Sequence, residues 1–239
     1  MAQFTKTQAV VFHLYPGIAI TLGMVLLIPA SVYYGFPPQF GMLIAIIFIA
    51  VPVLLAHLLQ AKKIENKTSI TQLNGFTNRL SAVKLISYSI ALVLFSFIVW
   101  GLIQPLDNII SQKIFPWIPS YFTTQTFDGY SKSKVLITLI VNLLINGLFA
   151  PYVEELYFRG YLLSRMKRWG KYAFAINAIL FSVYHFWQAT IYLTLIISLL
   201  PMTYLVSKTK DVRIAILTHS LLNITGALLS FGILHDLTS

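Results

Sequence analysis

The chain has few charged residues. Only 10% of its 239 residues are Asp, Glu, Lys or Arg, whereas 57% are hydrophobic. A soluble domain carries about 25% charged residues, which cover its surface. This composition, with a mean hydropathy of +0.78, excludes a soluble globular protein and a disordered chain. We therefore predict an all-α polytopic membrane bundle that forms a single integral membrane domain over residues 1–239.

Cysteine is absent, which excludes disulfides, thiolate metal sites and cysteine nucleophiles. The sequence also lacks the signatures of three kinds of intramembrane protease. It contains no HExxH of zincin-type metalloproteases, no GxSG of rhomboid-type serine proteases and no GxGD of aspartyl proteases. No cleavable signal peptide is evident, and the first apolar run is expected to be a retained membrane span.

Long stretches without Asp, Glu, Lys or Arg indicate the membrane spans. They are residues 7–61, 85–106, 135–153, 172–207 and 214–235. A spanning helix needs about 20 mainly apolar residues. The first stretch is long enough for two spans, with a turn signal at residues 35–38, and the fourth fits two short spans with a turn near residues 188–190. The sequence thus predicts about seven transmembrane helices.

Basic residues between the spans predict the orientation. With the N-terminus in the cytoplasm, 13 Lys and Arg residues fall in cytoplasmic segments, and only Lys113, Lys132 and Lys134 fall outside. The positive-inside rule therefore favours a multi-pass cell-membrane protein with its N-terminus cytoplasmic and its C-terminus outside. The net charge of +10 suits anionic lipid headgroups. We expect the lipid bilayer as a partner, and no nucleic acid.

Seven carboxylates exist, and two of them are adjacent. Five lie singly in loops or in the C-terminal tail by this reading: Glu65, Asp107, Asp128, Asp211 and Asp236. Glu154 and Glu155 follow an apolar run, where an ionisable group is costly and is a functional candidate.

Helical spacing separates the two adjacent glutamates. Glu155 and Arg159 are four residues apart and can form an ion pair. Glu154 points about 100° away and is left available for proton chemistry. The alternative, a solvated helix end in the headgroup layer, has equal weight on these residues alone.

Histidines and asparagines supply further polar groups inside the spans. We expect His185 within the fifth span and His219 within the seventh, where Asn223 follows one turn later on the same face. Taken singly, such residues make interhelical hydrogen bonds. That reading is applied to Asn142, Asn146 and Asn177. Three other histidines are expected to be packing or interface residues: His13, His57 and His235.

The combination is more specific than its parts. Glu154, His185, His219 and Asn223 together could activate a water molecule and stabilise an oxyanion. Equally, Glu154, His185 and His219 could form a His₂Glu site for a divalent metal such as zinc, with an open position for water. The residues alone leave both options open.

Three motifs in order resemble those of the CPBP family of intramembrane proteases, which includes CAAX proteases and bacteriocin-processing enzymes and was formerly called Abi. Residues 154–159 resemble its EExxxR motif, residues 181–185 its FxxxH motif and residues 219–223 its HxxxN motif. The motif-bearing core covers about residues 134–232. The compact size and short loops are typical of bacterial members.

This resemblance implies a role for each motif residue. Glu154 would activate the hydrolytic water, helped by His185, and His219 and Asn223 would stabilise the oxyanion. Glu155 and Arg159 would hold the site in shape. Both a metal-dependent and a metal-free glutamate mechanism are argued for the family. Because an amide is a poor zinc ligand and a good oxyanion donor, Asn223 favours the metal-free mechanism.

The first hypothesis is therefore an intramembrane endopeptidase acting on a peptide or membrane-protein substrate from the cytoplasmic side, of the bacteriocin-processing or self-immunity type. A second hypothesis is a non-catalytic membrane partner with an immunity or regulatory role. A third, a small transporter, lacks a visible repeat or paired broken helices.

Overall fold

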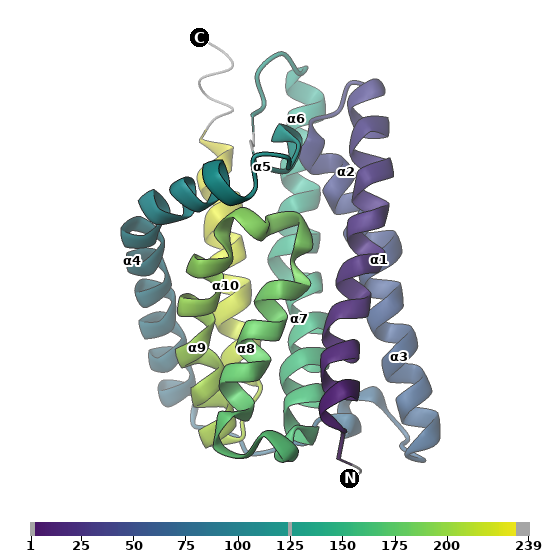
Figure 1. The fold of residues 1–239 in the computed structure, drawn as a ribbon, viewed down its shortest axis with the longest axis vertical. Helices are drawn as coiled ribbons and strands as arrows, with labels where there is room; N and C mark the ends of the chain where they lie inside the picture. The colour runs from purple at the N-terminus through teal and green to yellow at the C-terminus, as the bar shows by residue number, and fades with distance from the viewer. Residues whose placement is uncertain (1–2, 124–125, 233–239) are drawn as a thin grey trace.

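The computed structural model describes residues 3–123 and 126–232, which form a bundle of helices running along one common axis (Figure 1). Among these residues, six helical segments are long and apolar enough to cross a membrane. They are Lys6–Tyr33, Pro38–Ile64, Ala82–Ile114, Lys132–Arg165, Phe186–Thr209 and Arg213–Phe231. The described residues contain no strand, only an isolated bridge between Thr77 and Asp211. The predicted all-α polytopic bundle is confirmed.

Several spans are composite, with 3₁₀ or π segments (η) between α-helical ones. In chain order the elements are α1 (Lys6–Tyr33), α2 (Pro38–Ala45), η1 (Ile46–Ala50), α3 (Val51–Ile64), η2 (Ile70–Leu73), α4 (Ala82–Ile114), α5 (Ser120–Thr123), α6 (Lys132–Val141), η3 (Asn142–Phe149), α7 (Ala150–Glu155), η4 (Leu156–Leu162), η5 (Leu163–Arg165), η6 (Lys167–Tyr172), α8 (Ala173–Tyr184), η7 (Phe186–Ile191), α9 (Tyr192–Thr209) and α10 (Arg213–Phe231). The fourth span, from α6 to η5, contains two π segments, η3 and η4, and a third, η1, lies in the second span.

The predicted turn at residues 35–38 is confirmed. Gly35 has φ +71°, a left-handed conformation that glycine adopts without strain. Pro38 is the first residue of α2, where its missing N–H costs nothing. The first long apolar stretch therefore forms two antiparallel spans, as predicted.

The predicted division of residues 172–207 into two helices is confirmed, but only the second belongs to a candidate span among the described residues. Helix α8 ends at Tyr184, and α9 begins at Tyr192. With 12 residues, α8 is only about 18 Å long at 1.5 Å per residue, too short to cross alone. Its turn to α9 lies well below the upper ends of α1 and α6 in Figure 1, and η7 contacts α4 and α5. This hairpin consequently ends inside the bundle.

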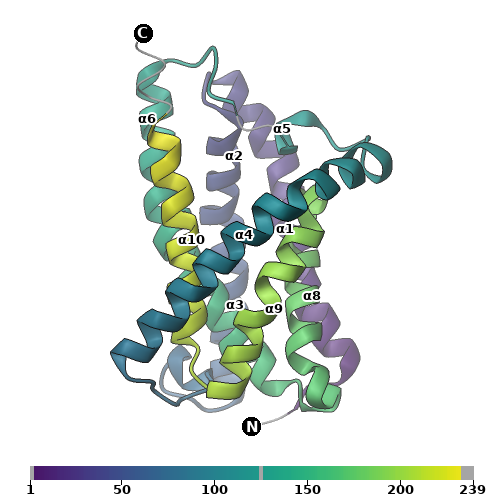
Figure 2. The same ribbon diagram turned by 90° about the vertical axis from the view of Figure 1, so that its left-hand side faces the viewer.

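Helix α4 is longer than predicted. It runs from Ala82 to Ile114 with Pro105 inside it, and it crosses diagonally over α9 and α10 (Figure 2). Asp107 is therefore not in a loop but within α4, where it is 3% exposed. The prediction was wrong here because it ended the span at the first charged residue, whereas the helix continues past it.

Two other carboxylates that were expected to lie singly are paired. Glu65 binds Arg165 at 2.8 Å, and the Arg165 side chain is fully buried. Asp211 accepts hydrogen bonds from Arg213 and from the backbone N–H of Leu80. Burial opposes ionisation of Asp211, but these hydrogen bonds outweigh it and hold its pKa below the ordinary value. Both pairs connect loops to helix ends.

His235 and Asp236 lie outside the described residues.

Candidate active site

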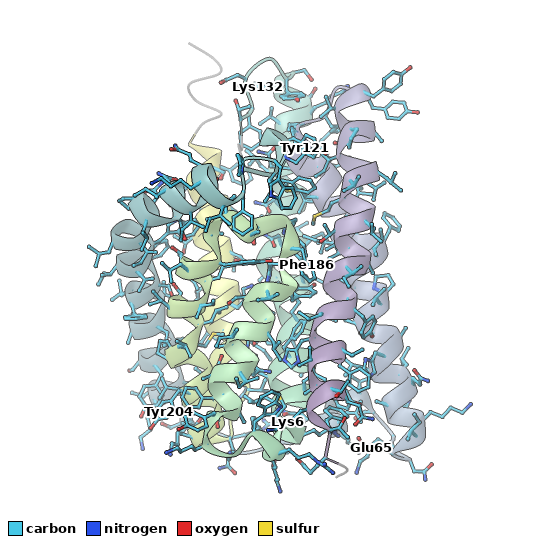
Figure 3. The ribbon with its side chains drawn as sticks, viewed as in Figure 1. Lys6, Glu65, Tyr121, Lys132, Phe186 and Tyr204 are labelled. Atoms are coloured by element: carbon cyan, nitrogen blue, oxygen red, sulfur yellow. The ribbon has the colours of Figure 1, made fainter. Side chains whose placement is uncertain are left out.

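The four predicted catalytic residues line one cavity of about 240 Å³, here called the site cavity. Glu154 comes from α7, His185 from the end of α8, and His219 and Asn223 from α10. Phe186, next to His185, lies between the two ends of the bundle, which are marked by Lys6 and Lys132 (Figure 3). The site cavity is therefore at mid-depth. A larger groove of about 710 Å³ lies around His57 between α1 and α3, but none of the four residues lines it.

The predicted ion pair is present at the base of this cavity. Arg159 Nη1 donates to Glu155 Oε1 at 3.1 Å, and both side chains are fully buried. Glu154 is half-buried on a different side of the helix and lines the cavity. The segment is therefore not a solvated helix end in the headgroup layer.

Glu155 has a second partner that the sequence reading missed. His219 Nδ1 lies 2.8 Å from the same oxygen, Glu155 Oε1. An ionised carboxylate only accepts hydrogen bonds, so Nδ1 carries the hydrogen and Nε2 is left for other contacts. Glu155 thus connects Arg159 to the histidine of α10 and fixes the orientation of its ring.

Phe181 is more than a packing residue. Its ring lies under the Arg159 guanidinium, with Cζ 3.9 Å from the ring centroid. Its edge contacts reach His185 at 4.8 Å and His219 at 6.3 Å between centroids. A guanidinium over an aromatic face is stabilised by the ring quadrupole. Phe181 therefore keeps the buried cation and the two imidazoles in a fixed arrangement.

His185 lies at the C-cap of α8 rather than within the span. Its Nδ1 is 2.8 Å from the carbonyl oxygen of Phe181. Because a carbonyl accepts only, Nδ1–H is the donor, and Nε2 of the neutral ring is an acceptor. Because the helix ends here, His185 lies on the wall of the site cavity, as its predicted catalytic role requires.

Glu154 and Asn223 each have a partner that the sequence did not indicate. The Tyr184 hydroxyl donates to Glu154 Oε1 at 3.3 Å. Asn223 Nδ2 donates to the backbone oxygen of Asn146 at 2.8 Å. In the sequence Tyr184 is one aromatic residue among many, and only the packing of α8 against the fourth span identifies it. The interhelical hydrogen bond expected of Asn146 is present, and it engages the amide of the HxxxN motif.

The first helix supports the site from outside the motifs. A Cβ on Gly17 would lie 2.2 Å from the carbonyl oxygen of Tyr184, so only glycine allows α1 to approach the end of α8. Asn177 donates to His13 Nε2 at 2.9 Å and to the Phe158 carbonyl. The interhelical role expected of Asn177 and the packing role expected of His13 are thus confirmed. The N-terminal helix therefore takes part in positioning Tyr184.

His57 is held in place by two tyrosine hydroxyls and by ring packing. Its Nδ1 lies 2.9 Å from the Tyr15 hydroxyl and 2.8 Å from the Tyr157 hydroxyl, and its ring packs against Phe12. This agrees with the packing role predicted for it.

The three predicted metal ligands lie around one cavity without forming a ligand group. Glu154, His185 and His219 line the same cavity, but among residues 3–123 and 126–232 no three His, Asp or Glu side chains form a group that could hold an ion. The Nδ1 hydrogen bonds of His219 and His185 leave both Nε2 atoms free, as in many metal-ligating histidines, so these bonds do not argue against ligation. As placed, these residues do not fit a three-ligand centre. The metal site stays a prediction.

Residues 136–225, which contain all three motifs, match a family model described as type II CAAX prenyl endopeptidase Rce1-like. This segment is thus similar to the CAAX intramembrane proteases. No curated protein and no solved structure matches the chain. This similarity and the six candidate membrane spans among the described residues support a hydrolase of peptide bonds in a multi-pass membrane protein, with the bilayer and a peptide or protein substrate as partners.

The arrangement combines two kinds of group that peptide hydrolysis can use. Glu154 and His185 Nε2 are acceptors that line the site cavity. On α10, Asn223 has one N–H that is not bound to Asn146, and His219 would add Nε2–H as a donor when its ring carries both protons. Peptide hydrolysis needs an acceptor for the proton of water and donors for the developing oxyanion. Both are available from helices rather than from loops, which limits their motion.

Proposed function

We propose that this chain is an intramembrane endopeptidase that hydrolyses a peptide bond of a peptide or membrane-anchored protein from the cytoplasmic side. The observation that best supports this is the convergence of Glu154, His185, His219 and Asn223 on one mid-depth cavity. A purely structural bundle has no need for a half-buried carboxylate beside two imidazoles at that depth.

In the proposed mechanism, Glu154 accepts a proton as the water oxygen attacks the scissile carbonyl carbon. His185 Nε2 accepts a hydrogen bond from the same water and orients it. The C–N bond then breaks, and the proton held by Glu154 passes to the leaving amine. The Tyr184 hydroxyl, which donates to Glu154 Oε1, keeps this carboxylate directed into the site cavity.

The oxyanion would be stabilised by His219 and Asn223. His219 is oriented by Glu155 through Nδ1, and Nε2–H would donate when the ring carries both protons. Asn223 has two N–H donors, one of which is held by Asn146, so the other could serve the substrate. Glu155 and Arg159 act as positioning residues, since neither needs to touch the substrate.

We further propose the catalytic unit, orientation and substrate class. The catalytic unit is the motif-bearing part, about residues 134–232, with the N-terminus cytoplasmic and the C-terminus outside. The many basic residues at the end of the bundle that contains Lys6 support this orientation (Figure 3). The substrate is a prenylated CAAX-type chain or, in a bacterial setting, a bacteriocin-related peptide.

The proposed function is tested by reconstituting the full chain in liposomes and adding two probes, a farnesylated CAAX-box peptide and an unprenylated peptide of the same sequence. We expect mass spectrometry to detect cleavage of at least one probe. Folded protein that cleaves neither would favour the non-catalytic immunity or regulatory partner instead.

We expect hydrolysis to continue after treatment with a strong chelator, because the placed side chains do not fit a metal centre. The measurement is activity and bound metal with and without chelator. Stoichiometric zinc, with activity lost on chelation and restored by zinc, would contradict this expectation. In that case His185→Ala and His219→Ala should lose the metal, whereas Asn223→Ala should keep it.

A further inference from the structure

A second cavity of about 390 Å³ adjoins the site cavity. It lies between α2, α6, η3, η7 and α10, on the side of the bundle where α6 begins and α10 ends (Figure 1). Its lining is unusually polar for the interior of a membrane bundle. The polar side chains are Gln39, Thr138, Asn142, Asn146, Gln188, Asn223 and Ser230. Since most of them carry amides, it is called here the amide cavity.

Gln39 is the most unusual of these residues. It is 9% exposed, and neither Oε1 nor Nε2 has a hydrogen-bond partner among the described residues. A buried amide without partners destabilises the fold, because it loses its hydrogen bonds to water and gains none in return. A packing role would be served better by leucine or methionine. An amide at this position is therefore explained by a partner that enters the cavity.

The amide cavity shares part of its wall with the site cavity. Both are lined by Asn146, Gln188 and Asn223. Asn223 is thus at the boundary, with Glu154 and His185 on one side of it and Gln39 on the other. A chain bound across Glu154 could extend into the amide cavity without leaving the protein.

We propose that the amide cavity binds the main chain of the substrate on one side of the scissile bond, with Gln39 pairing with a peptide unit. This inference rests on the proposed function, because it takes the occupant to be the peptide being cut. An extended peptide inside the bilayer needs partners for its N–H and C=O groups, each of which is costly when unpaired. Side-chain amides offer both a donor and an acceptor, as a peptide bond does.

The test uses the absence of cysteine in the chain. Gln39→Cys is introduced into the Glu154→Gln background, and its reaction with N-ethylmaleimide is followed in the full chain in liposomes. The control is Thr203→Cys, because Thr203 is also fully buried with an unpartnered Oγ1 but lines neither cavity. The probes are the farnesylated CAAX-box peptide and its unprenylated counterpart.

We expect the Gln39→Cys variant to react while the Thr203→Cys variant does not, and a probe peptide at ten times its Kd to slow the reaction about tenfold. If the probe slows the reaction of the Gln39→Cys variant but the wild type does not cleave it, the binding site is supported and the proposed function is contradicted. If a probe that the wild type cleaves does not slow the reaction of the Gln39→Cys variant, the proposal is wrong and the cavity is a path for water. An unreactive Gln39→Cys variant that reacts only after denaturation would overturn it as well.

Discussion

Replacing Glu154 with glutamine should lower kcat by about 10²–10⁴-fold, the usual contribution of a general base. Glutamine has nearly the same shape, so it preserves the packing of α7 and still accepts the hydrogen bond from Tyr184. It cannot, however, take a proton from water. Turnover of the reconstituted variant is measured with the CAAX-box peptides, together with its expression and melting temperature. Wild-type turnover in this variant would exclude Glu154 as the base.

A matched pair of tyrosine variants serves as the control for this result. Tyr184→Phe removes the hydroxyl that donates to Glu154, whereas Tyr157→Phe removes another fully buried hydroxyl, which donates to the Phe12 carbonyl outside the site cavity. We expect the first to lower kcat and the second to change only stability. Equal losses of kcat in both would mean that the Tyr184 effect is a general packing effect.

The second large effect concerns the Glu155–Arg159 pair. Glu155→Ala and Arg159→Ala should each lower the free energy of unfolding by about 3–5 kcal/mol, because each leaves an unpaired charge in a fully buried position. The double variant should lose less than the sum of the two single losses. Thermal or denaturant unfolding in detergent measures all three variants, and strict additivity would contradict a coupled pair.

The two single variants should differ in their remaining activity. Glu155→Ala also removes the acceptor of His219 Nδ1, so its kcat per folded molecule should fall. The control is Glu65→Gln, which breaks a comparable ion pair with buried Arg165 at the end of the bundle. That variant should be less stable but retain its kcat. If its kcat falls as much as that of Glu155→Ala, the loss of activity in Glu155→Ala is due to lower stability alone.

The spans were predictable because the cost of burying a charge is large and local. Charge-free stretches therefore locate the helices α1, α9 and α10 and the turn at Gly35. The same rule fails where a charge is buried inside a helix. Asp107 within α4 and Arg165 at the end of the fourth span are both buried, and no pattern of sequence spacing distinguishes them from loop residues.

The candidate site was predictable only within each motif. The i and i+4 spacing indicated the Glu155–Arg159 pair because both residues belong to one helix. The contacts of Tyr184 with Glu154 and of His219 with Glu155 join different helices, so they depend on how the helices rotate against one another. Gln39 could not have been found for the same reason, since its significance comes from the cavity that surrounds it.

The π-helical segment η3 (Asn142–Phe149) has a consequence for how this span can change in length. A π segment winds more loosely than an α-helix, which accommodates extra chain within the span. Each residue of an α-helix turns the chain by about 100°. Deleting one residue of η3 would remove this extra chain and let the span close as a regular α-helix, with its flanking parts near their present register. The same deletion in the α-helical part α6 would rotate the flanking parts by roughly that angle. The span should therefore tolerate the loss of one residue from η3 better than the loss of one residue from α6.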